Sequence, residues 1–284
     1  IALLSLILLV QQLFDGSAVP EIPAIEEEVT SIRIEGPSAE ITAQRSGGQW
    51  LLGEENYPAD SGKVERLIER ITDLRVLERV SSTDFLSPYR LDAAEAIQVT
   101  LYSEGRELRT VLIGGGSPTG RQSYIRFPDS SEVLLVAENL RRDFEIRADD
   151  LREKRILTLD PSSIRRLGVT MPPEISLDLF RDSESWASAD GRSVDGEKVA
   201  AYLRNFEALE ASGFPEGVVD SGELLMHLEV ETDGGEIFLE LLSETAEGEY
   251  HARSSETPYI FSLSGFKGNQ LLSGPQEFIL ADDQ

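Results

Sequence analysis

The most constraining feature of this sequence is that its second half repeats the spacing of its first half. Asp60 precedes an apolar series, and Asp195 precedes a matching series 135 positions later. In each series the apolar residues recur at intervals of three and four, which is typical of one buried stripe on an α-helix. The aspartate stands where the N-cap belongs. The two series are Val64, Leu67, Ile68, Ile71 and Leu74, and Val199, Tyr202, Leu203, Phe206 and Leu209. A repeat of this kind indicates two structural units of one plan.

The segments on both sides of the two predicted helices repeat as well. Upstream, Trp50 and Trp186 are 136 positions apart. Downstream, alternating apolar runs surround Glu104-Gly105 in the first half and Asp233-Gly234 in the second half, with an offset of 129. Alternation with a period of two predicts strands, and the dipeptides that end in glycine predict hairpin turns. The runs are Ile97, Val99, Leu101 with Leu108, Thr110, Leu112, and Met226, Leu228, Val230 with Ile237, Leu239, Leu241.

The final strands of each half match at a smaller offset. Tyr124 corresponds to Tyr250, and the run 133–136 corresponds to 259–262, both 126 positions apart. Shortened loops between fixed elements would make the offset fall in such steps. In the first half, further strands are predicted near 32–35, 40–44, 49–52 and 123–126. The sequence therefore predicts an α+β fold, with two tandem copies of a mainly antiparallel sheet packed with one amphipathic helix.

The pattern divides the chain into five predicted parts. Residues 1–14 are interpreted as the truncated end of a membrane anchor, and residues 15–28 as a polar linker. The first α+β repeat is expected over 29–145 and the second over 164–284. Residues 146–163 join the two repeats as a connector.

The N-terminal segment 1–14 is almost uniformly apolar. A bilayer span needs ~20 apolar residues, so the segment fits an anchor that begins further upstream; a cleaved signal peptide or a buried element of the first repeat are the alternatives. The acidic run Glu26–Glu28 that follows fits the non-cytoplasmic side, because positive charge normally stays in the cytoplasm. These features predict a single-pass cell-membrane protein with the bulk of the chain in an extracytoplasmic, periplasmic compartment.

The composition narrows the classes of function. The chain carries 26 Lys and Arg against 52 Asp and Glu, a formal net charge of −26. A surface this negative repels phosphate backbones and anionic headgroups, which argues against binding of nucleic acid and against electrostatic membrane docking. The chain has no cysteine, which excludes disulfides, thiolate catalysis and sulfur-ligated metal sites.

Motifs that carry chemistry are missing from the sequence. Gly114–Gly120 lacks the ending of a phosphate-binding loop and is interpreted as a flexible inter-strand loop. His227 and His251 are expected on exposed strand faces, without a nucleophile pentapeptide or a calcium loop elsewhere. Trp50 and Trp186 are assigned a shared core role. The sequence thus predicts no enzyme activity, no cofactor and no metal site.

The densest basic cluster lies in the predicted connector, at Arg152, Lys154 and Arg155. The preferred interpretation is a solvated segment whose charges pair with the acidic surface. The alternative is that these three residues contact an anion or a partner.

Several of these motifs together resemble a known bacterial family, the domain of unknown function numbered 4340. The matching residues are Trp50 and Leu52, Ala59-Asp60 with Val64, Tyr89-Arg90-Leu91-Asp92, and Leu151-Arg152-Glu153-Lys154-Arg155-Ile156-Leu157. The family usually has glycine at the position of Arg90, and often a proline soon after Asp92, where this chain has Ala93-Ala94.

The resemblance implies a membrane-anchored extracytoplasmic protein, of a kind often encoded beside the permease and auxiliary components of gliding-type ABC transporters. It implies no catalytic residues. Three hypotheses follow. The first is a non-enzymatic accessory or interaction protein of such a transport or gliding-type complex. The second is a module that binds a small anion between the two repeats. The third is a hydrolase, which would require a deep pocket that holds His227 or His251 beside two carboxylates.

Overall fold

The computed structural model describes residues 20–173, 175–182, 185–215, 222–244 and 248–280. The chain divides into two compact units, Ile1–Glu153 and Lys154–Gln284. The predicted anchor, residues 1–14, lies outside the described residues. None of the described helices is long and apolar enough to cross a bilayer.

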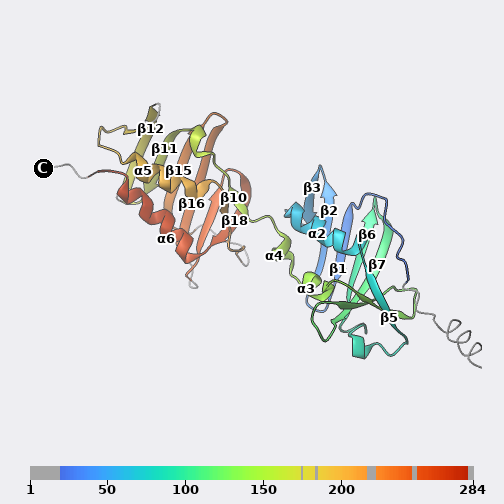
Figure 1. Cartoon of the computed structure of the whole chain (residues 1–284). Coiled ribbons are helices and arrows are strands. Elements are labelled where there is room, and N and C mark those ends of the chain that lie inside the picture. The colour runs from blue at the N-terminus through green and yellow to red at the C-terminus, as the bar shows by residue number, and fades with distance from the viewer. Residues whose placement is uncertain (1–19, 174, 183–184, 216–221, 245–247, 281–284) are drawn as a thin grey trace, which may run out of the picture. The chain divides into compact units, whose positions relative to one another are not determined.

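The first unit is built on a sheet of nine strands in the order β4-β3-β2-β1-β6-β7-β8-β9-β5 (Figure 1). All neighbouring strands in it are antiparallel. The strands are β1 (Ser31–Glu35), β2 (Glu40–Ser46), β3 (Gln49–Leu52), β4 (Tyr57–Pro58), β5 (Val76–Ser82), β6 (Ile97–Ser103), β7 (Arg106–Gly116), β8 (Ser123–Arg126) and β9 (Glu132–Val136). The helices are α2 (Ser61–Thr72), α3 (Leu140–Phe144) and α4 (Ala148–Leu151).

The second unit contains a sheet of seven antiparallel strands in the order β13-β12-β11-β15-β16-β17-β18. The strands are β11 (Ile164–Met171), β12 (Ile175–Asp182), β13 (Ser185–Ser188), β15 (Leu224–Thr232), β16 (Gly235–Glu244), β17 (Tyr250–Ser254) and β18 (Thr257–Leu263). A separate pair is formed by β10 (Arg155–Leu157) and β14 (Leu209–Glu210). The helices are α5 (Gly196–Leu203) and α6 (Gly265–Ser273).

The two large sheets have corresponding strand orders. The seven strands of the second sheet follow the order of β3, β2, β1, β6, β7, β8 and β9 in the first. Strands β4 and β5 extend the first sheet beyond these seven at its two edges. The predicted α+β class with mainly antiparallel sheets is therefore confirmed, and so are the predicted strands that became β1, β2, β3, β6, β7, β8 and β9.

The two predicted helices begin at their predicted caps. The side chain of Asp60 accepts a hydrogen bond from the backbone N–H of Lys63 at 3.0 Å. The side chain of Asp195 accepts from two backbone N–H groups, each at 3.1 Å. Such a cap contributes about 1 kcal/mol, because it satisfies donors that the first helical turn leaves without partners.

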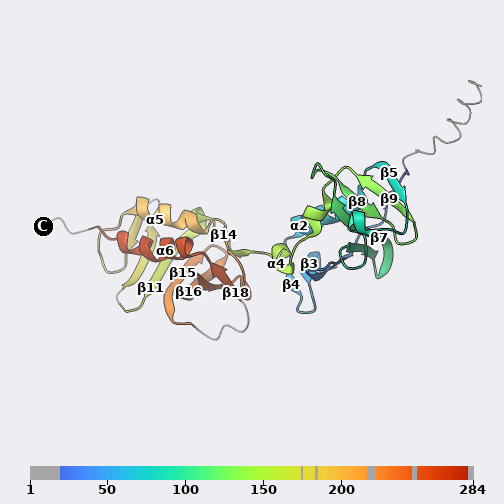
Figure 2. The same ribbon diagram turned by 90° about the horizontal axis from the view of Figure 1, so that it is seen from below.

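The apolar stripes of both helices face the sheets. The buried residues of α2 are Val64, Leu67, Ile68 and Ile71, and those of α5 are Val199, Tyr202 and Leu203. Trp50 is 2% exposed in the core of the first unit, whereas Trp186 is half-buried at the edge of the second core. In Figure 2, α5 and α6 lie on one side of the second sheet, and the other side carries no helix.

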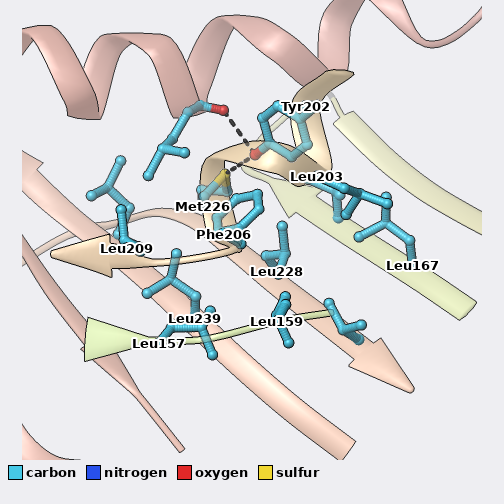
Figure 3. Close-up of a cluster of buried hydrophobic side chains, with 14 of the residues drawn as sticks. Leu157, Leu159, Leu167, Tyr202, Leu203, Phe206, Leu209, Met226, Leu228 and Leu239 are labelled. Carbon is cyan, nitrogen blue, oxygen red and sulfur yellow. Dashed lines mark hydrogen bonds between the residues drawn. The ribbon is translucent and has the colours of Figure 1, made fainter. Parts of the chain in front are cut away.

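Tyr202 is buried in the second core (Figure 3). Its ring packs edge-on against Phe206 and Phe278 at centroid distances of 5.2 and 5.1 Å. Its hydroxyl donates to the backbone carbonyl of Leu271 in α6 at 3.0 Å. Burial raises the pKa of this phenol, so it stays neutral. The bond connects α5 to α6 across the core.

The prediction of one helix in each unit is wrong. Short helices also follow the last strand of each large sheet, α3 after β9 and α6 after β18. Helix α6 packs on the core through Leu271, which is fully buried, and through Gly268. A side chain at position 268 would begin 2.0 Å from the ring of Tyr250. Because one of its packing positions carries no side chain, the helix shows no full apolar stripe in the sequence.

The predicted alternation of Leu108, Thr110 and Leu112 does not mark the buried face of β7. Val111 and Ile113 are fully buried instead. The pairing of β6 with β7 shifts register between Leu101 and Tyr102. Because one extra residue moves every following side chain to the other face, this bulge reverses the pattern. Strand β16 has no such shift beside its turn, and its predicted core residues Leu239 and Leu241 are buried.

The predicted correspondence between the two sheets is also shifted by one residue in their last two strands along the chain. Tyr250 is buried in the second core, whereas Tyr124 lies half-buried in edge-on contact with Tyr89. Ile125 and Ala252 are the residues that occupy equivalent places, since each pairs with a buried residue of the preceding strand. The predicted match of Tyr124 with Tyr250 is therefore wrong by one position.

The glycine run is not the flexible loop that the sequence suggested. Gly114, Gly115 and Gly116 are the last residues of β7. A Cβ atom on Gly114 would lie 2.3 Å from the carbonyl oxygen of Tyr89 and 2.8 Å from Leu91. Because these glycines have no side chains, the segment 87–92 can pack directly on the strand. Within that segment Arg90 has φ +54°, a left-handed conformation that glycine adopts at less cost.

A pair of alanine substitutions tests this packing. Gly114→Ala is expected to lower the free energy of unfolding by about 1–3 kcal/mol, because its new methyl group overlaps a backbone oxygen. Gly116→Ala is the control on the same strand, since its Cβ would meet the nearest atom at an ordinary 3.6 Å. Urea denaturation of the two variants measures the difference. Equal stability of the two variants would contradict the packing described here.

Candidate functional site

The predicted basic cluster is divided between the two units. The guanidinium of Arg152 lies 3.9 Å from the centre of the Tyr57 ring and 3.3 Å from a carboxylate oxygen of Asp149. Lys154 begins the second unit, and its ammonium donates to the carbonyl of Ser212 at 3.4 Å. Arg155 is exposed at the start of β10. Arg152 and Lys154 thus contact their own units, and a shared anion or partner site of the three stays a prediction.

The connector that carries this cluster is not a solvated segment throughout. Leu151 is 3% exposed in the core of the first unit, and Ile156, Leu157 and Leu159 are buried in the core of the second. Its apolar residues therefore belong to the two units, which the sequence did not indicate because the connector is rich in charged residues of both signs.

His227 belongs to a row of charged side chains across the second sheet. Its Nδ1 lies 3.2 Å from an Oε1 atom of Glu240, and its Nε2 lies 3.9 Å from Glu229. Glu240 is also bound by Arg253. Burial would raise the pKa of Glu240, but the hydrogen bonds and charges of Arg253 and His227 outweigh it and hold that pKa below its ordinary value. Glu240 is thus ionised at neutral pH, where it forms an ion pair with Arg253.

This row lies on the sheet face opposite the core. His227 and Glu229 alternate along β15 with the buried Met226, Leu228 and Val230. A second group on the same face joins Arg166 to both carboxylate oxygens of Asp178, at 2.8 and 3.1 Å. We call this surface, with Phe180, Phe238 and the charged residues just named, the outer face of the second unit. His227 has its two carboxylates, but on a half-exposed sheet surface, not in a deep pocket.

His251 lies on β17, where it pairs with Leu242 on one side and Ser262 on the other. It is half-buried. Among the described residues, no group of three or more His, Asp and Glu side chains is placed to hold a metal ion. The two histidines are thus on separate strands, and no catalytic assembly around either of them is evident in the described part of the chain.

A hollow of about 820 Å³ is a candidate site in the first unit. One wall is the N-terminal segment 20–25, and the opposite wall includes Gln98, Thr100 and Tyr102 of β6, with Phe127 in the turn between β8 and β9. The lining mixes apolar and polar side chains.

The N-terminal segment that supplies one wall belongs to residues 15–28, which were predicted to be a polar linker. Ion pairs join Glu28 to Arg45, at 2.7 Å, and Glu27 to Arg106. The carbonyl of Pro23 accepts a hydrogen bond from Arg109. The described part of the predicted linker, residues 20–28, is therefore attached to the sheet.

Arg109 is the residue that makes this attachment and stabilises α2 at the same time. It is only 9% exposed, and its Nη1 donates to the carbonyls of Ile71 and Thr72 at 2.7 and 3.1 Å. These carbonyls end α2 and have no partner within the helix. Burial lowers the pKa of Arg109, and the charge of Asp73 opposes this effect. The sequence did not predict that Arg109 binds the end of α2, because the residue stands within an alternating strand far from that helix in the chain.

Comparison with protein-family models identifies one family. The model for the domain of unknown function DUF4340 matches residues 50–226. The chain belongs to the DUF4340 family. No curated protein and no solved structure matches it.

The DUF4340 match begins at Trp50 on β3 and ends at Met226 on β15. It therefore includes α2, the segment 87–92 and α5, and crosses the boundary between the two units. Within the matched residues, Trp50 is buried, Asp60 caps α2, and Leu91 packs against Gly114.

Removal of the buried guanidinium tests the role of Arg109. Arg109→Met is expected to lower the free energy of unfolding by about 2–3 kcal/mol, because the last carbonyls of α2 lose a charged donor while buried. Arg106→Met on the same strand loses only its exposed pair with Glu27 and should change stability by less than about 1 kcal/mol. Chemical denaturation measures both variants. A smaller loss in Arg109→Met than in Arg106→Met would contradict the capping role.

Proposed function

We propose that this DUF4340 protein is a non-enzymatic, membrane-anchored extracytoplasmic protein that binds a partner protein through the outer face of its second unit. The observation that carries the proposal is the exposed Phe180 beside Arg166 on that face. Phe180 is 42% exposed, and the guanidinium of Arg166 lies 5.7 Å from its ring centre. Aromatic and arginine side chains are enriched in protein interfaces, where an aromatic anchor contributes much of the binding energy.

The chemistry of the outer face supports binding over catalysis. Its carboxylates are paired with bases, as in Asp178 with Arg166 and Glu240 with Arg253. A nucleophile or a general base needs a partner poised for proton transfer on a bound substrate. An array of ion pairs on a sheet surface instead favours recognition of a partner with a complementary charge pattern.

The two units support a further part of the proposal, that the chain arose by duplication of one module. Equivalent strands occur in the same order in both large sheets. The equivalent residues, judged by strand pairing, are 136 positions apart at Trp50 and Trp186, and 127 apart at Ile125 and Ala252. Under this proposal the shared positions serve packing, and the positions that differ serve recognition.

The membrane anchor and the partner are inferred from the sequence. The apolar segment 1–14 and the acidic run after it support an extracytoplasmic protein on a single anchor. The family resemblance suggests the permease or auxiliary subunits of an ABC-type transport or gliding-type complex as the partner. The alternative, an anion site between the repeats, is less favoured because Arg152 and Lys154 contact groups within their own units.

A photo-crosslinking amino acid at position 180 tests the proposal in cells. The full chain is expected to form a cross-link to a membrane-transporter subunit, identified by mass spectrometry after detergent extraction. Phe266 in α6 is the control position, since it is 80% exposed and lies outside the outer face. The cross-link from position 180 should exceed that from position 266 at least fivefold.

Two outcomes would contradict the proposal. One is recovery of the chain alone from both positions, in repeated extractions. The other is cross-linking of equal strength from positions 180 and 266, which would show that the contact does not depend on the outer face.

A further inference from the structure

One end of the first unit gathers arginines, although acidic residues in this chain outnumber basic ones two to one. The arginines come from three segments that meet beside the ends of β7 and β8. Arg90 lies against Gly115, where a Cβ atom would be 3.1 Å from the arginine Cδ. Arg141 in α3 donates its backbone N–H to the hydroxyl of Ser123 at 3.2 Å, and its side chain reaches the carbonyl of Glu95 at 2.6 Å.

The side chain of Asn139 brings two more arginines to the same place. Its Nδ2 donates to the carbonyl of Gly120 at 2.8 Å, and its Oδ1 accepts from the backbone N–H of Arg142 at 3.2 Å. Because Gly120 directly precedes Arg121, one amide group holds the backbone near Arg121 and the backbone of Arg142 close together. We call Arg90, Arg121, Arg141 and Arg142 the arginine end.

Two of these four side chains carry uncompensated charge. Arg90 pairs with Glu95 at 2.9 Å, and Arg141 pairs with Glu145 at 3.2 Å. The guanidinium groups of Arg121 and Arg142 are exposed and have no acceptor among the described residues. Most other arginines of this unit are paired with carboxylates, namely Arg33, Arg45, Arg70, Arg75, Arg79, Arg106, Arg126 and Arg152.

The acidic residues near the arginine end are already occupied by other bases. Glu138 lies 3.4 Å from Arg75, and Asp143 lies 3.1 Å from Arg70. The positive charge of Arg121 and Arg142 is therefore not neutralised by their sequence neighbours. Guanidinium forks are the groups that bind a tetrahedral phosphate oxyanion through paired N–H donors.

The second unit does not repeat this arrangement. The sequence between β16 and β17 contains two glutamates, Glu247 and Glu249, and no arginine. At the start of α6, which follows β18 as α3 follows β9, the ammonium of Lys267 is bound by Asn205 and Gln270. Packing explains the features that both units share. The arginine end is not one of these features, so packing does not explain it.

We propose that the arginine end binds a phosphate-type anion through Arg121 and Arg142. The anion is either a free phosphate compound or the headgroup of a phospholipid. This binding site is separate from the outer face of the second unit, so it can fail or succeed independently of the proposed partner.

Calorimetric titration with inorganic phosphate at low ionic strength tests the proposal. The full chain is held in nanodiscs of phosphatidylcholine, and the test variant is Arg121→Gln/Arg142→Gln. The control is Arg66→Gln/Arg147→Gln, which removes two exposed positive charges elsewhere in the same unit. The unaltered chain and the control are expected to bind phosphate with the same Kd, and the test variant at least tenfold more weakly.

A second titration identifies the source of the anion. In nanodiscs that also contain phosphatidylglycerol, an anionic headgroup that occupies the site raises the apparent Kd for inorganic phosphate at least threefold in the unaltered chain; an unchanged Kd identifies a free phosphate compound. The proposal is overturned if the unaltered chain binds no phosphate in phosphatidylcholine nanodiscs. It is equally overturned if the test variant and the control lose affinity to the same extent.

Discussion

Each unit depends on covering one face of an antiparallel sheet with helices that are too short to be stable alone. Helices of eight to twelve residues are marginal in water, so α2 and α5 require the sheets that receive their buried side chains. Each buried large side chain contributes about 1.5–3 kcal/mol, and only when a sheet face excludes water from it. The aspartate caps and the guanidinium of Arg109 then satisfy the backbone groups at the helix ends.

Local chemistry explains which parts of this fold could be predicted from sequence. The caps at Asp60 and Asp195, the apolar stripes and the strand alternation act over a few residues, and all of them were predicted. The bulge between Leu101 and Tyr102 arises from pairing between strands, so the alternation in the sequence did not identify the buried face of β7. Contacts made by absent side chains, as at Gly114 and Gly268, leave no apolar signal at all.

The candidate sites were less predictable than the fold for the same physical reason. Arg109 acts through carbonyls 37 and 38 positions away in the chain, and Arg121 and Arg142 are joined by the amide of Asn139. Only tertiary structure brings these groups together. The cluster at Arg152, Lys154 and Arg155, which is contiguous in sequence, is instead divided between the two units. Features that the two units share are explained by the packing of their cores. Features in which the units differ, such as the arginine end, are not explained by the cores and are therefore candidates for recognition.

The central claim is that each unit is a self-contained module with its own core, and it can be measured on two fragments. Fragments 20–153 and 154–284 each contain one tryptophan, Trp50 or Trp186, whose fluorescence reports on that unit alone. The structure predicts that each fragment has a single cooperative unfolding transition in urea and a near-UV circular dichroism signal of fixed aromatic packing. A fragment that shows neither the transition nor the signal would contradict the claim.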